Sequence, residues 1–146
     1  MSSSAQQNQE QIQRLTVSRD NAQSRLRVVQ TEINQLIRRR DLIERAIREI
    51  GRIISNAESA ISQLEKLDCE NTTQWNGNKQ RQAVAAYNQS LNATRPFMRD
   101  VNRIETSLVR ALDRTIRELE AAQRDQAALN THISDLNNQI ASLRRG

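Results

Sequence analysis

The side chains that most often carry chemistry in proteins are scarce in this sequence. His132 is the only histidine and Cys69 the only cysteine, so histidine-based catalysis, histidine-ligated metals and an internal disulfide all lack members. The close carboxylates Glu118 and Glu120 fall on a predicted exposed helix face and not in a cleft. No phosphate-binding, dinucleotide-binding or zinc-protease motif is present. We therefore predict that the protein is not an enzyme and uses no cofactor or metal.

The composition instead favours long helices. Aromatic residues make up 2% of the 146 residues, and one proline and three glycines leave few of the turns that a β-rich fold needs. Hydrophobic residues make up 36%, which suits a thin core running along helices better than a thick globular core. We predict an all-α fold in a single domain over residues 1–146.

The sequence also lacks the signals of membrane insertion or of a cleaved leader. No apolar run approaches the ~20 residues that a membrane-spanning helix needs. The first residues, MSSSAQQNQEQ, lack the basic start and apolar stretch of a signal peptide. We expect no membrane insertion, no signal peptide and a cytoplasmic location.

Apolar residues recur with a mean spacing of 3.5 in two long segments. In the first segment fourteen of sixteen core positions are apolar. They are Ile12, Leu15, Arg19, Ala22, Leu26, Val29, Ile33, Leu36, Arg40, Ile43, Ile47, Ile50, Ile54, Ala57, Ile61 and Leu64. In the second segment fourteen of eighteen are apolar. They are Val84, Tyr87, Leu91, Thr94, Met98, Val101, Glu105, Leu108, Leu112, Thr115, Leu119, Ala122, Gln126, Leu129, Ile133, Leu136, Ile140 and Leu143. Such sustained heptads are typical of a coiled coil.

The segment between the two heptad regions is a predicted loop. Residues 68–78, DCENTTQWNGN, have no periodicity and are rich in Asn, Asp, Thr and Gly. A reversal there makes a long antiparallel two-helix hairpin, with helices at about 6–67 and 79–144. We expect the second helix to continue through Pro96 with a kink, because the heptad crosses the proline without a change of phase.

The two heptads predict a register for this hairpin. When two helices run antiparallel, the numbers of two residues that lie side by side add up to the same sum along the whole hairpin. The core positions of the two heptads lie opposite each other when this sum is 148. The resulting core pairs are Ile12–Leu136, Ile33–Thr115, Ile47–Val101, Ile50–Met98 and Ile61–Tyr87. Arg40 and Glu105 then fall in adjacent core layers. We predict an ion pair between them that specifies the register more than it stabilises the fold.

One side of the loop-proximal half has additional apolar residues beside the core. We call this set the apolar seam, and its members are Ala46, Ile53, Ala60, Leu67, Phe97, Ile104 and Ala111. At the predicted register Ala46 lies near Ile104 and Ile53 near Phe97, so the residues form one surface. Because two helices cannot bury this second stripe, it predicts a docked helix from another copy or another protein. The alternative is an apolar face covered by arginine stems.

Arginines gather near the middle of the predicted hairpin. The run at 38–40, together with Arg45, Arg48 and Arg52, lies at the level of a second set of arginines, and the two sets make an arginine belt. The second set is Arg95, Arg99, Arg103 and Arg110. Acidic residues are interleaved with the belt at ion-pair spacing, and the aromatic residues that stack on single strands are missing. The pattern does not favour nucleic-acid binding, and an acidic protein partner or solubility explains the belt equally well.

The loop contains the motif Trp75–Asn76–Gly77 between the two heptad segments. A helical hairpin with Trp-x-Gly in its connection resembles the WXG-type proteins of bacterial type VII (ESX) secretion. In this position Gly77 is expected to supply a positive φ for the reversal, and Trp75 to cap the open end of the bundle. The chain is longer than the small secreted members, and it most resembles the longer helical-hairpin proteins encoded beside LXG toxins.

This resemblance implies a non-enzymatic adaptor or targeting chaperone. Such proteins bind the helical N-terminal domain of an LXG toxin, often with a second small helical protein, and present it for export. The family's export signal, a Tyr followed four positions later by Asp or Glu, is absent, since Leu91 follows Tyr87 at that spacing. The resemblance then implies that another subunit carries the signal and that this chain either stays in the cytoplasm or leaves with its cargo.

A second interpretation needs no toxin. A structural coiled-coil protein with this sequence would self-associate through the apolar seam into an antiparallel four-helix homodimer. Light scattering on the isolated chain separates the two interpretations, because only the second requires a tight dimer.

Overall fold

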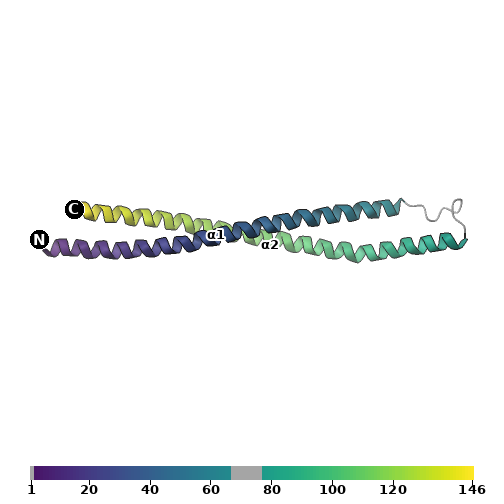
Figure 1. The fold of residues 1–146 in the computed structure, drawn as a ribbon, viewed down its shortest axis with the longest axis horizontal. Helices are drawn as coiled ribbons and strands as arrows, with labels where there is room; N and C mark the ends of the chain where they lie inside the picture. Colours follow the sequence, from purple (N-terminus) through teal and green to yellow (C-terminus); the bar gives the residue numbers. More distant parts are fainter. Residues whose placement is uncertain (1, 67–76) are drawn as a thin grey trace. The chain divides into compact units, whose positions relative to one another are not determined.

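The computed structural model describes residues 2–66 and 77–146, which form two long α-helices (Figure 1). Helix α1 spans Ser2–Glu65 and helix α2 spans Gly77–Arg145. No strand occurs in the described residues, so the predicted all-α helical hairpin is confirmed. The helix ends lie close to the predicted ones, although α1 begins nearer the N-terminus and α2 begins two residues earlier, at Gly77.

Both helices continue through the residues that weaken them most. α2 is unbroken at Pro96, which has no N–H to donate to the carbonyl one turn earlier. Just before the proline, the Thr94 hydroxyl donates to the Ser90 carbonyl oxygen at 2.6 Å. Gly51 is helical too, within α1. The continuous helix is therefore confirmed, whereas the predicted kink at Pro96 is wrong, because the long helices bend by only 2°.

The two helices contribute to two compact units. Unit 1 comprises Met1–Arg40 and Arg114–Gly146, and unit 2 comprises Asp41–Asp113. In unit 1 the first turns of α1 and the last turns of α2 lie at the same end, so the helices there are antiparallel (Figure 1).

The predicted heptads describe the buried faces of both helices. All sixteen core positions of α1 and all eighteen of α2 are buried or partly buried. This includes the polar core residues Arg19, Arg40, Glu105 and Gln126, each of which is partly buried. A 3.5-residue spacing keeps one stripe of each helix against the other helix, which is why the pattern in the sequence predicts burial so well.

The register between the helices differs from the predicted one. In unit 1, Arg39 Nη1 lies 3.2 Å from Glu118 Oε2, a pair whose numbers sum to 157. A second contact agrees, since Arg19 Nη1 donates to Asn137 Oδ1 at 3.3 Å and those numbers sum to 156. Both sums are larger than the predicted 148. Long exposed side chains can contact residues above or below their own level, so the buried core is the better measure of the register.

The buried core of unit 1 gives the register more directly. Its main cluster joins two residues of α1 to two of α2, and the level pairs are Ile33–Ala122 and Leu36–Leu119. Each of these pairs sums to 155, which is one heptad beyond the predicted sum. The predicted register is therefore wrong in unit 1. The sequence could not exclude this, because a slip of seven residues keeps every core position facing the other helix.

Deep burial is concentrated in unit 1. Among the described residues, every fully buried hydrophobic residue except Val101 belongs to this unit. The set in unit 1 is Ala22, Ile33, Leu36, Leu119, Ala122, Leu136 and Ile140. Thr115 is the one buried polar residue in the described part of the chain, and its side chain has a partner. Unit 2 has the same heptads but leaves most of its core positions only partly covered.

Candidate interaction surface

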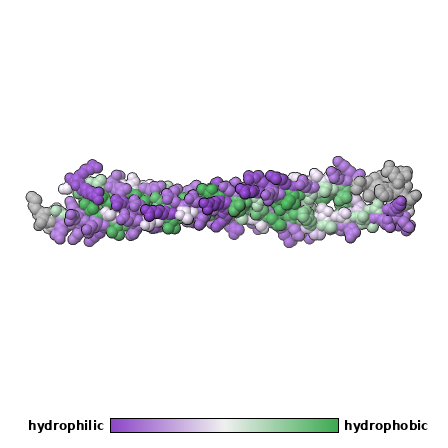
Figure 2. Space-filling model, in the orientation of Figure 1, coloured by the Kyte–Doolittle hydropathy of each residue, from purple (hydrophilic) through white to green (hydrophobic). Residues whose placement is uncertain are grey.

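Large hydrophobic side chains that remain exposed are found mainly in unit 2. Among the described residues, Val17 and Val28 are the exposed examples in unit 1. Those in unit 2 are Leu42, Ile53, Phe97, Ile104 and Val109. Figure 2 shows hydrophobic side chains gathered over the part of the molecule that unit 2 occupies. Unit 2 therefore combines a thinly covered core with an uncovered apolar surface, which is the usual property of a partner-binding surface.

The described residues of the apolar seam all belong to unit 2. Ile53 is 43% exposed, Phe97 47% and Ile104 49%, so each of the three large side chains has about half its surface in contact with water. Ala60 is exposed, and Ala46 and Ala111 are partly buried. Leu67, the remaining predicted member, lies outside the described residues.

The neighbours within the seam differ from the predicted ones. Phe97 borders the same groove as Ala60 of α1, and Ile53 is not part of that groove. The predicted contact between Ile53 and Phe97 is therefore wrong, for the same reason as in unit 1, a register one heptad longer. Ala60 and Phe97 sum to 157. Successive heptads of unit 2 then place Ile53 level with Ile104 and Ala46 level with Ala111.

An open groove of about 380 Å³ lies at the Phe97 end of the seam. Its lining is Ala57, Ala60, Ile61, Leu64, Ala93, Thr94 and Phe97. Alanines from both helices form part of its walls, and a short side chain there leaves room that a longer one would fill. The groove offers no charged group, so the side chain that fits it is apolar.

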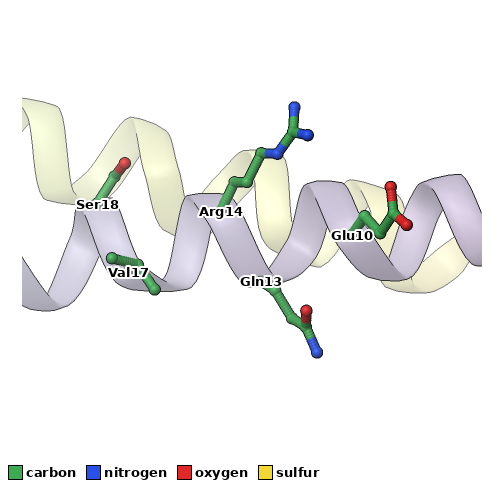
Figure 3. A pocket seen from close by; sticks show the side chains of 5 residues that line it. All are labelled: Glu10, Gln13, Arg14, Val17 and Ser18. Carbon is green, nitrogen blue, oxygen red and sulfur yellow. The ribbon is translucent and has the colours of Figure 1, made fainter.

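Two other depressions on the described surface do not bring reactive groups together. One is lined by Glu10, Gln13, Arg14, Val17 and Ser18, all from α1. Figure 3 shows Arg14 and Gln13 pointing away from each other across the helix. In the described residues no three His, Cys, Asp or Glu side chains are placed to hold a metal ion.

The residues considered for catalysis, metal binding or nucleic-acid binding are exposed or pair with a neighbour, where the structure describes them. His132 is exposed on α2, and Cys69 lies outside the described residues. Glu118 pairs with Arg39, and Glu120 is exposed. In the arginine belt, Arg99 and Arg103 are exposed as well. The ion pair between Arg39 and Glu118 was not predicted from the sequence, because the predicted register did not place these two residues near each other.

Gly77 is the described part of the Trp-x-Gly motif. Its φ of 35° is positive, as the motif predicts, and glycine adopts this conformation without the strain that a Cβ brings. It is also the first residue of α2, so the left-handed residue lies where the helix begins. Trp75 lies outside the described residues, and its capping role stays a prediction.

The predicted ion pair of Arg40 and Glu105 spans the two units and stays a prediction. Both residues are partly buried.

Comparisons with known proteins assign no family to the chain. No family model matches the sequence, and no curated protein or solved structure matches it. Neither described helix contains a stretch that is both long enough and apolar enough to cross a bilayer.

Proposed function

We propose that the protein is a non-enzymatic adaptor of bacterial type VII secretion that binds the helical N-terminal domain of an LXG toxin and presents it for export. The observation that carries the proposal is the uneven packing of the two units. Unit 1 contains all but one of the fully buried hydrophobic residues in the described part of the chain, whereas unit 2 leaves Ile53, Phe97 and Ile104 half exposed along one side. The choice of secretion system is based on the Trp-x-Gly motif that connects the two helices, in which Gly77 has the expected positive φ.

The physical role of the toxin domain would be to complete the packing of unit 2. Covering the exposed half of a large apolar side chain contributes about 1 kcal/mol of binding free energy, at about 25 cal/mol per Å². Three such side chains on one stripe favour a helix as the partner, because a helix presents its own apolar residues at the same spacing. A second small helical protein would extend the same bundle.

Co-purification tests this proposal. The toxin N-terminal domain encoded beside this gene is co-expressed with the wild-type chain and with the variants Ile53→Lys and Ile104→Lys. The wild-type chain is expected to form a stable complex, and each variant to lose it, because a lysine in the seam brings an unpaired charge into an apolar interface. Circular dichroism is expected to show unchanged helicity, since both positions are exposed in the isolated chain.

Val109→Lys is the matched control. Val109 is 50% exposed in the same unit, close to the 49% of Ile104, but it lies outside the apolar seam. The control variant is expected to retain the complex. Equal loss with Val109→Lys, or unchanged toxin secretion after deletion of the gene, would contradict the proposal. A tight homodimer that ignores the toxin domain and dissociates with Ile104→Lys would instead support self-association.

A further inference from the structure

We draw no further inference here: the strongest candidate, the apolar seam of unit 2 around Ile53, Phe97 and Ile104, carries nothing beyond the proposed function, because nothing in the structure shows what covers it.

Discussion

At the scale of single residues, burial and not reactivity distinguishes the side chains of this protein. Leu36 is 3% exposed in the unit 1 cluster, whereas Val28, on the same helix, is 69% exposed. The ion pair of Arg39 and Glu118 is more than half exposed on both sides, so solvent screening leaves it little stabilising effect. The stability of unit 1 therefore comes mainly from its apolar core.

Truncation of these two residues is expected to have unequal effects. Leu36→Ala removes a buried side chain and leaves a cavity, which should lower the free energy of unfolding by about 2–5 kcal/mol. Val28→Ala, as the control on the same helix, should change it by less than about 0.5 kcal/mol. Urea unfolding followed by circular dichroism measures both. Similar losses from the two variants would mean that the core does not lie at the Ile33–Leu119 cluster.

At the scale of the elements, both helices tolerate residues that interrupt shorter helices. Gly51 in α1 and Gly77 at the start of α2 have different reasons for being glycine. A Cβ on Gly51 would meet nothing within 4 Å, and its backbone is helical. Gly77 has the same open space but a φ of 35°, which an L side chain adopts only with strain.

The same substitution should therefore have opposite signs at the two glycines. Gly51→Ala is expected to raise the free energy of unfolding by about 0.5–1 kcal/mol, because alanine loses less backbone entropy in a helix. Gly77→Ala should lower it by about 1 kcal/mol, because of the left-handed conformation. Thermal unfolding of the two variants beside the wild-type chain measures both shifts. A stabilising Gly77→Ala would show that the positive φ is not required.

At the scale of the whole molecule, the pairing of the two helices decides which side chains meet. Ile61 and Thr94 border one groove in unit 2, and their numbers sum to 155. The register expected from the loop would have placed Ile61 beside Tyr87 instead. Both registers bury the same faces of both helices, so they differ only in the partners that each residue contacts.

Cysteine cross-linking distinguishes the two registers. In a Cys69→Ser background, the pair Ile61→Cys with Thr94→Cys is expected to form an intramolecular disulfide on mild oxidation. The control pair Ile61→Cys with Tyr87→Cys should not, because the second position lies one heptad, or about 10 Å, away along the helix. Non-reducing electrophoresis and mass spectrometry detect the bond. Preferential cross-linking of the control pair would restore the predicted register.

The sequence by itself determined the helices, their buried faces and the composition of the apolar seam. Each of these is a property of one helix, and a helix repeats regularly enough for residues such as Ile53 or Leu119 to be assigned to a face from spacing alone. The positive φ of Gly77 was predictable for a similar reason, because it depends on local backbone sterics.

Only the tertiary structure decided the register, and with it the neighbours across the helices. A heptad repeat is unchanged by a shift of seven residues, so no spacing in the sequence selects Ile33–Ala122 over Ile33–Thr115. The unequal packing of the two units was equally hidden, because unit 1 and unit 2 have the same apolar pattern at their core positions. How completely each unit buries its core depends on how well the side chains of the two helices fit together, and this fit is a property of the packed helix pair.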